Sequence, residues 1–335
     1  MDVLITGGAG FVGTRLAREL LGRGELDGRA IRRLVLADQV APPPALALDA
    51  RVETRVGALL DQCATLRDEP FDAVFHLASA VSGECERDFE LGLRSNLDTT
   101  RALLDALRAA GNAPRLVFSS TIAVFGNDAR HPLPPEVNDD TLPVPQTSYG
   151  THKLMCEYLI ADYSRKGFID GRSARLATVT VRPGRPNGAA SSFFSGIVRE
   201  PLAGVESICP VAPAVRHGLS SPRRTVEGLI ALFEADREHL GSRLALNLPA
   251  LNVSVQQMLD ALEAVAGRAV RDRVRFEADP AIVRIVDGWP TGVIAARAAA
   301  LGLRPETSFE HVIAAYIEDN AGDAAALRGL PGRGA

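Results

Sequence analysis

The segment that most constrains the fold is a glycine-rich loop close to the N-terminus. It reads Thr6-Gly7-Gly8-Ala9-Gly10-Phe11-Val12-Gly13 and joins an apolar run, residues 3–6, to an amphipathic stretch, residues 11–23. Two spacings fit, G-x-G-x-x-G from Gly8 and G-x-x-G-x-x-G from Gly7. Glycines permit a tight turn and a close approach of the backbone to a pyrophosphate, and the helix that follows offers free N–H groups. In this strand–loop–helix context, the loop predicts a dinucleotide-binding α/β domain.

An acidic residue, Asp38, ends the second predicted strand and is followed by Gln39. A carboxylate at this position can accept hydrogen bonds from both ribose hydroxyls of an adenosine. The same charge repels a 2′-phosphate, and no arginine follows it directly, so NAD is expected rather than NADP. Asp38 lies 25 residues after Gly13, and the polar insert 24–29 accounts for the excess over the usual spacing of about 20.

Short apolar runs alternate with amphipathic stretches through the first half of the chain. The pattern predicts strands over 3–6, 34–37, 52–56, 73–77, 116–120 and 177–181, and helices over 11–23, 91–110 and 149–164. Continuous apolar strands that alternate with helices are typical of a parallel sheet covered on both faces. The expected fold is therefore α/β, a doubly wound parallel sheet of the Rossmann type with a smaller C-terminal α/β region.

The second half is less regular and is expected to carry the substrate loops. Residues 183–222 are rich in Gly, Pro, Ser and Arg and predict loops with short elements. Helices are expected over 226–238, 254–266, 291–301 and 308–319, with a candidate strand over 243–248. We expect residues 1–182 to form the NAD-binding domain, to which part of the later chain can return, 183–320 the substrate-binding region, and 321–335 a flexible tail.

Composition excludes several classes of protein. The chain has 37 basic and 41 acidic residues, a net charge of −4, so it has no cationic surplus for nucleic acid. No apolar run approaches the ~20 residues of a membrane span, and the N-terminus does not resemble a signal peptide. The four cysteines are scattered, which favours a reduced, cytoplasmic setting. The six histidines have no metal-ligand spacing, so no metal is expected.

A tyrosine and a lysine, Tyr149 and Lys153, lie four residues apart in a predicted helix and so share one face. A free tyrosine hydroxyl has a pKa of about 10, and a nearby ammonium favours the phenolate. The charge of an oxidised nicotinamide would act in the same direction. The run Ser119-Ser120-Thr121 ends the fifth predicted strand, at the sheet edge where ligands bind in open α/β folds. A hydroxyl there could orient a substrate alcohol against the tyrosine.

Together these segments resemble the extended short-chain dehydrogenase/reductases over the first 185 residues. The matching segments are Thr6–Gly13, Asp38, His76-Leu77-Ala78-Ser79, Asn96, Ser119-Ser120-Thr121 with Val124-Phe125-Gly126, and Tyr149-Gly150-Thr151-His152-Lys153. The resemblance implies Tyr149 as acid/base, Lys153 as its activator and Thr121 as the hydroxyl partner. The NAD contacts that it implies are Gly7, Gly10, Phe11, Val12, Gly13, Asp38, Gln39, Leu77, Ala78, Ser79, Asn96, Ser119, Tyr149, Lys153 and Pro183.

Differences within this family narrow the expected reaction. Dehydratase members carry an Asp-Glu pair where this chain has Ile122-Ala123, and nucleotide-sugar epimerases carry an aromatic-Asn-Pro segment that residues 181–195 lack. Those residues, together with Arg216-His217, Ser221-Pro222-Arg223 and Gly288-Trp289-Pro290, are similar to the D-erythronate dehydrogenase branch. Such enzymes use NAD to oxidise the C2 hydroxyl of D-erythronate to 2-oxo-D-erythronate, and a homodimer is a family-level expectation.

A sugar acid needs donors for its carboxylate, and arginine binds carboxylates bidentately. We expect Arg185 or Arg223 to hold it. The expected substrate contacts are Ser79, Ser82, Thr121, Ile122, Tyr149, Arg185, Ser192, His217 and Arg223. Two other functions remain open: a nucleotide-sugar 4-epimerase with tightly held NAD, which would use the same Tyr149 and Lys153, and a non-catalytic NAD-binding sensor. The stereochemistry and chain length of the substrate also stay open.

Overall fold

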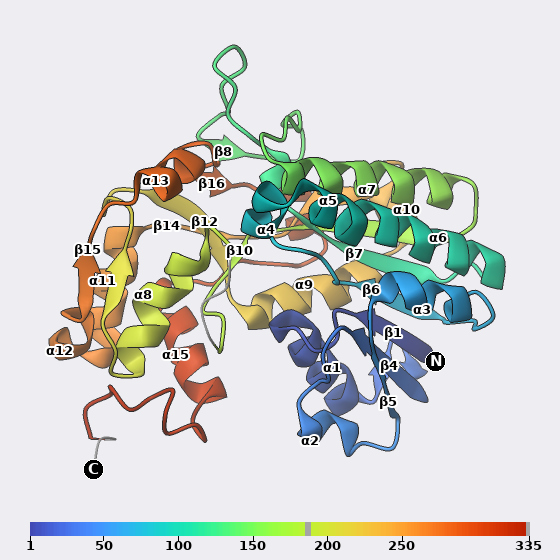
Figure 1. Cartoon of the computed structure of the whole chain (residues 1–335), viewed down its shortest axis with the longest axis horizontal. Helices are drawn as coiled ribbons and strands as arrows, with labels where there is room; N and C mark the ends of the chain where they lie inside the picture. Colours follow the sequence, from blue (N-terminus) through green and yellow to red (C-terminus); the bar gives the residue numbers. More distant parts are fainter. Residues whose placement is uncertain (185–188, 333–335) are drawn as a thin grey trace.

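A seven-stranded sheet forms the centre of the protein in the computed structural model, which describes residues 1–184 and 189–332 (Figure 1). The strand order is β13-β9-β7-β6-β1-β4-β5, and every neighbouring pair is parallel. This arrangement confirms the doubly wound α/β fold. The strands are β1 (Asp2–Thr6), β4 (Arg33–Asp38), β5 (Val52–Val56), β6 (Ala73–His76), β7 (Arg115–Thr121), β9 (Asp170–Leu176) and β13 (Ala245–Asn247).

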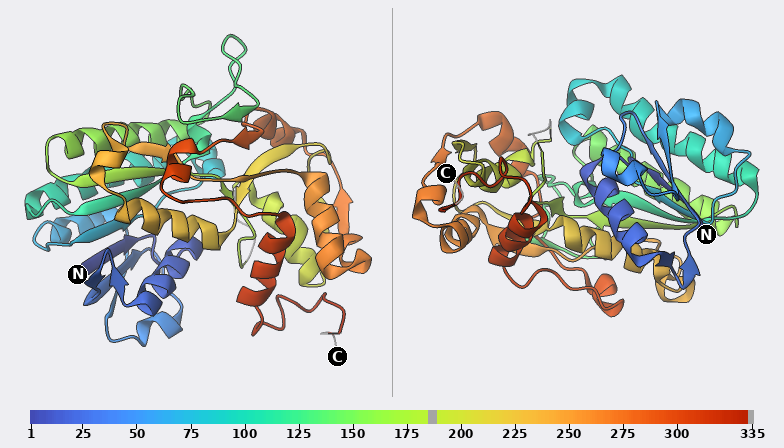
Figure 2. Two further views of the ribbon diagram at one scale, coloured as in Figure 1. Left: turned by 180° about the vertical axis from the view of Figure 1, so that it is seen from behind. Right: turned by 90° about the horizontal axis from the view of Figure 1, so that it is seen from below.

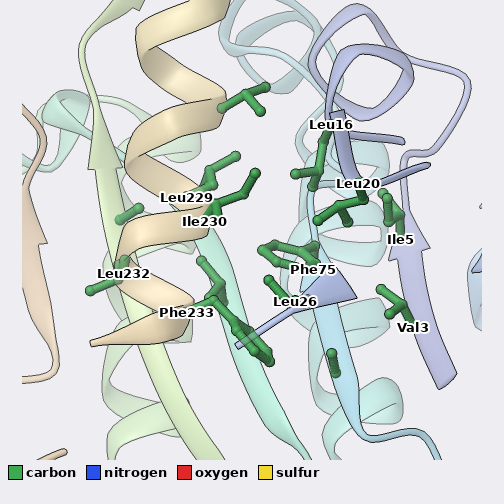
Figure 3. Packing of buried hydrophobic residues seen from close by; sticks show 14 of the residues in the cluster. Val3, Ile5, Leu16, Leu20, Leu26, Phe75, Leu229, Ile230, Leu232 and Phe233 are labelled. Atoms are coloured by element: carbon green, nitrogen blue, oxygen red, sulfur yellow. The ribbon is translucent and has the colours of Figure 1, made fainter. Parts of the chain in front are cut away.

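Helices cover both faces of this sheet because successive apolar residues of each strand point to opposite sides. Val3 and Ile5 of β1 pack on one face against α1 (Phe11–Arg23) and α9 (Pro222–Glu234), as Figure 3 shows. Leu4, between them, faces the other side. There the core is built from α3 (Leu59–Leu66), α6 (Thr99–Ala110) and α7 (Ser148–Arg165). Both α9 and β13 come from the second half of the chain, which therefore returns to the central sheet.

A second hydrophobic core belongs to the smaller region beside the sheet (Figure 2). Its main sheet pairs β10 (Thr178–Val179), β12 (Arg216–Ser220) and β14 (Leu251–Ser254). Phe194 of α8 (Ser192–Leu202), Leu259 of α11 (Val255–Ala266) and Ile313 of α15 (Phe309–Asp319) meet in the core. No helix in the described part of the chain is long and apolar enough to cross a membrane.

Short elements connect these parts. They are β2 (Glu25–Leu26), β3 (Arg29–Ala30), α2 (Pro44–Ala47), α4 (Ser82–Arg87), α5 (Phe89–Gly92), the π-helical η1 (Leu93–Asp98), the 3₁₀ turn η2 (Ile122–Val124), β8 (Glu136–Val137), β11 (Ser207–Cys209), α10 (Arg237–Leu240), α12 (Arg268–Arg271), β15 (Val274–Phe276), α13 (Pro280–Asp287), β16 (Gly292–Val293) and α14 (Ala296–Ala300).

The sixth strand of the central sheet was predicted in the wrong place. Residues 177–181 contribute β10 to the small sheet, and the central strand is β9. Its sequence, Asp-Gly-Arg-Ser-Ala-Arg-Leu, has no apolar run. Its two arginines are held by polar partners instead of apolar contacts. Arg172 donates to Asp170 (2.7 Å), and Arg175 pairs with a buried glutamate of α7. Hydrophobicity could not indicate a strand that is stabilised by buried ion pairs.

Several other boundaries differ from the prediction. The helix expected over 91–110 contains η1, and the helix expected over 291–301 is β16 followed by α14. The loops expected over 183–222 contain the full helix α8. Part of the predicted tail packs against the fold, because Leu327 is fully buried and the Gly329 N–H donates to the Leu202 carbonyl (2.8 Å).

Candidate active site

The glycine loop makes a cradle that side chains would fill. Gly7 adopts φ +70°, and a Cβ there would come within 2.7 Å of the Ala78 nitrogen. A Cβ at Gly13 would overlap the Gly7 carbonyl oxygen. Helix α1 begins after Gly10, which offers no side-chain cap. The first N–H groups of the helix therefore face the loop without a side-chain acceptor, as an anion-binding N-terminus requires.

Asp38 lies beside this loop at the end of β4. Its Oδ2 accepts a hydrogen bond from the Ala9 N–H (3.0 Å), and its backbone carbonyl accepts from Gly57 (2.8 Å). The carboxylate is thus fixed at the edge of the glycine cradle. Gln39 is exposed directly after it. This placement is compatible with the predicted contact to an adenosine ribose.

The ends of β6 and β7 line the next part of the same edge. Thr6 Oγ1 accepts hydrogen bonds from the N–H groups of Leu77 (3.2 Å) and Ala78 (3.3 Å). The Oδ1 of Asn96, in η1, accepts from the Ser79 hydroxyl (3.1 Å). Four of the residues implied as NAD contacts, Leu77, Ala78, Ser79 and Asn96, therefore form one connected cluster beside the glycine loop.

Tyr149, Lys153 and Thr121 converge where α7 starts against the end of β7. The Lys153 Nζ donates to the Ser119 carbonyl (2.8 Å) and lies 5.7 Å from the centroid of the Tyr149 ring. The Thr121 side chain lies close enough to Tyr149 to lower the pKa of its hydroxyl. Gly150 permits this approach, since a Cβ there would overlap the Ala123 carbonyl oxygen. The three predicted catalytic side chains are thus neighbours.

Burial shifts the pKa values of both Tyr149 and Lys153. Desolvation raises the pKa of Tyr149 to about 12, against the lowering effects of the Arg182 guanidinium and the Thr121 hydrogen bond. Desolvation lowers the pKa of Lys153 to about 8. Arg182 was not among the predicted site residues, although it directly follows a predicted strand and precedes Pro183. Its Nε donates to the Val179 carbonyl (2.9 Å), and its guanidinium lies 5.8 Å from the Phe11 ring centroid.

His217 has contacts that favour packing over the predicted substrate contact. The side chain is 2% exposed. Its Nε2 is 2.8 Å from Thr178 Oγ1 and its Nδ1 is 3.2 Å from the Pro290 carbonyl oxygen. The ring packs between Phe194 and Trp289, with centroids 5.3 and 5.1 Å away. Both nitrogens have partners within the protein, and burial lowers the pKa to about 4.

Arg223 lines a cavity of about 430 Å³ that reaches from the glycine loop to Pro183. Its guanidinium contacts Asp319 (2.6 Å) and Glu318 (2.8 Å), and Arg15 of α1 also pairs with Asp319 (2.6 Å). These ion pairs connect α15 to α1 and α9. The guanidinium is therefore already engaged by two carboxylates, and the predicted contact of Arg223 with a substrate carboxylate remains a prediction.

The other predicted substrate residues lie in several places. Ser82 begins α4, Ser192 begins α8, and the buried Ile122 begins η2, directly after Thr121. Arg185 lies outside the described residues. Ser79 donates to Asn96, and Ile122 follows the end of β7 in the chain. The substrate contacts expected of Ser79, Ser82, Ile122 and Ser192 remain predictions.

Comparison with known proteins agrees with this geometry. The NAD dependent epimerase/dehydratase family model matches residues 3–213. The chain is 52% identical to D-erythronate dehydrogenase of Cupriavidus necator over 95% of this chain and 98% of that protein, and 43% identical to D-erythronate dehydrogenase of Haemophilus influenzae over 95% and 99%. The crystal structure of a protein named nucleoside-diphosphate-sugar epimerase, from Agrobacterium tumefaciens, superposes with a TM-score of 0.89 at 42% identity, covering 97% of this chain and 96% of that one. The chain belongs to the NAD dependent epimerase/dehydratase family.

Proposed function

We propose that this protein is an NAD-dependent dehydrogenase that oxidises the C2 hydroxyl of D-erythronate to give 2-oxo-D-erythronate. The observation that carries the proposal is the convergence of Tyr149, Lys153 and Thr121 beside the glycine cradle. It occurs in a chain that is 52% identical, over 95% of its length, to the D-erythronate dehydrogenase of Cupriavidus necator.

The residues at the sheet edge fit NAD. The glycine cradle and the start of α1 would hold the pyrophosphate, and Asp38 would bind the adenosine ribose. When bound, NAD supplies the hydride acceptor, which is the redox chemistry that side chains cannot provide. The protein contributes orientation and proton transfer.

The catalytic residues would then divide the work at the substrate alcohol. Thr121 and Tyr149 hold the hydroxyl, and the Tyr149 oxygen takes its proton. Lys153 stabilises the Tyr149 phenolate that accepts this proton, while the Ser119 carbonyl fixes the position of the Lys153 ammonium (2.8 Å). Because burial raises the pKa of Tyr149 to about 12, the neighbouring cations are needed to bring the phenolate into reach near neutral pH.

The cofactor assignment predicts the effect of removing one charge. We expect Asp38→Asn to weaken NAD binding by about tenfold, since hydrogen bonds to charged groups contribute about 1.5–3 kcal/mol. NADP binding should not weaken, because the charge that repels its 2′-phosphate is gone. Titration of NADH and NADPH fluorescence measures both affinities. Equal losses for the two cofactors would contradict the ribose assignment.

Two arginines should have separable effects on the reaction. We expect Arg182→Leu to move the rise of kcat/KM with pH upward by about one unit, because loss of the cation leaves the pKa of Tyr149 higher. Arg223→Leu should raise KM for the sugar acid, and the pH at which kcat/KM rises should stay as in the wild type. NADH formation measured between pH 6 and 10 tests both variants. An unchanged KM in Arg223→Leu would exclude it as the carboxylate ligand.

A second candidate function is nucleotide-sugar epimerisation, which is favoured by the 42% identity to the Agrobacterium tumefaciens protein named as such an epimerase. The deciding experiment is an NADH-formation screen over aldonic acids of four to six carbons, with UDP-sugars as controls. Net NADH with D-erythronate supports the dehydrogenase. Interconversion of UDP-sugars without net NADH would replace it by the epimerase, and NAD binding with no turnover on either class would replace it by a sensor.

A further inference from the structure

A buried ion pair lies beneath the catalytic face of α7. Glu157 and Arg175 form a bidentate pair, with Nε–Oε1 at 2.9 Å and Nη2–Oε2 at 2.7 Å. The two residues are 5% and 7% exposed. The Ser120 hydroxyl donates to the same carboxylate at 2.5 Å. A charge pair buried this deeply is costly unless its hydrogen bonds are satisfied, and its contribution to stability alone is a weak reason for its presence.

The pair lies where it can act on the catalytic residues. Glu157 follows Lys153 by four residues and Tyr149 by eight, so all three share one face of α7. Ser120, which Glu157 holds, lies between Ser119 and Thr121. Ser119 supplies the carbonyl that binds the Lys153 ammonium (2.8 Å). The Glu157 carboxylate therefore connects the helix that carries the acid/base pair to the strand end that carries its partners.

Glu157 differs from the other titratable groups near Lys153 in its charge. The titratable groups that face the lysine are Tyr149, Cys156 and Glu157 on α7, Cys85 on α4 and His76 on β6, with Arg175 of β9 behind Glu157. Burial raises the pKa of both thiols. Burial lowers the pKa of His76 to about 3. At neutral pH the thiols and the histidine carry no charge, so among these groups the Glu157 carboxylate is the anion that does not depend on the protonation of Tyr149, and it opposes the desolvation that lowers the pKa of Lys153.

We propose that Glu157 is a positioning residue that holds the Lys153 ammonium in its charged form and fixes the 119–121 end of β7 against α7. Arg175 neutralises the buried Glu157 carboxylate, so that the carboxylate can act on Lys153 without being an unpaired buried charge. The inference rests on the proposed function for its catalytic meaning. Its physical content, the charge state of Lys153, is independent of any substrate.

The sequence permits a direct measurement, because its only lysines are Lys153 and the exposed Lys166. NMR of the protein labelled with ¹³C at lysine Cε then follows two side chains, with Lys166 as internal reference. We expect Glu157→Gln, which keeps the shape and loses the charge, to lower the pKa of Lys153 by about one unit. Lys166 should titrate as before. An unchanged Lys153 titration would overturn the proposal.

Two further variants separate charge from packing. Ser120→Ala removes the hydroxyl and keeps the carboxylate, so its Lys153 titration should match the wild type. Glu157→Asp retains the negative charge, so the pKa of Lys153 should stay close to its wild-type value. If Glu157→Gln does not fold, the double variant Glu157→Gln/Arg175→Met leaves no unpaired buried charge, and the Lys153 pKa should again fall, by less than in Glu157→Gln because the Arg175 cation is also gone. A shift in Ser120→Ala as large as in Glu157→Gln would indicate a merely structural role.

Turnover supplies the catalytic readout. With Glu157→Gln, the loss of kcat at alkaline pH should begin about one pH unit lower than in the wild type, because Lys153 loses its proton earlier. NAD binding at neutral pH should remain. If D-erythronate proves not to be the substrate, the NMR titration still decides the inference, whereas a failed titration with normal D-erythronate turnover removes the inference and leaves the proposed function.

Discussion

Tyr149→Phe is expected to lower kcat for D-erythronate oxidation by about 10³-fold, the range that acid–base catalysis contributes. The substitution removes one oxygen and keeps the ring that lies 5.7 Å from the Lys153 ammonium. The Kd of NADH, measured by fluorescence titration, should therefore change by less than about twofold. Loss of turnover with intact cofactor binding would assign the proton transfer to the hydroxyl.

Tyr158→Phe is the matched control, since Tyr158 lies on the same helix and is 65% exposed. It removes the same atom at a solvent-exposed position, and turnover should equal that of the wild type. Retained turnover in Tyr149→Phe, or equal losses in the two variants, would remove Tyr149 from the mechanism.

Gly13→Ala is expected to weaken NAD binding by about 100-fold, which corresponds to about 3 kcal/mol of distortion. The added Cβ would overlap the Gly7 carbonyl oxygen, so the loop must shift away from the path of the pyrophosphate. Isothermal titration calorimetry with NAD measures the loss of affinity. Thermal unfolding without cofactor measures how far the variant is destabilised in general.

Gly22→Ala provides the comparison within the same helix. A Cβ at Gly22 meets no atom within 4 Å, and alanine is the better helix former. This variant should bind NAD like the wild type and unfold at the same or a slightly higher temperature. If Gly13→Ala bound NAD equally well, the loop would not be the pyrophosphate cradle.

The sequence predicted the parts of the fold in which local pattern and tertiary role agree. Helix α1 and strand β5 have the expected bounds, 11–23 and 52–56. Strand β9 escaped prediction because Arg172 and Arg175 are buried through ion pairs and hydrogen bonds, some of which join distant segments. A one-dimensional hydrophobic pattern contains no information about partners in α7. Strand β13 lies within the candidate strand over 243–248, although the pattern did not identify β9 as its neighbour.

The site divides along the same line. The glycine loop, Asp38, Tyr149 and Lys153 could be named from the sequence because each belongs to a short local pattern: a strand–loop–helix, the end of a strand, and a spacing of four residues on one helix. The residues that tune them could not. Arg182, which follows β10 in the chain, lowers the pKa of Tyr149. Glu157 is held in position by Arg175 and Ser120. The substrate contact predicted for His217 stays a prediction, and its ring is packed between Phe194 and Trp289.

The most direct test of the central claim follows the hydrogen at C2. D-Erythronate carrying deuterium at C2 would be incubated with the enzyme and NAD, and the nicotinamide product analysed by mass spectrometry. Hydride transfer from C2 predicts one deuterium in each NADH formed, a 2-oxo acid in equal amount, and neither product with Tyr149→Phe. NADH without deuterium, or no NADH while UDP-sugars are interconverted, would contradict the assignment of this protein as a C2 dehydrogenase.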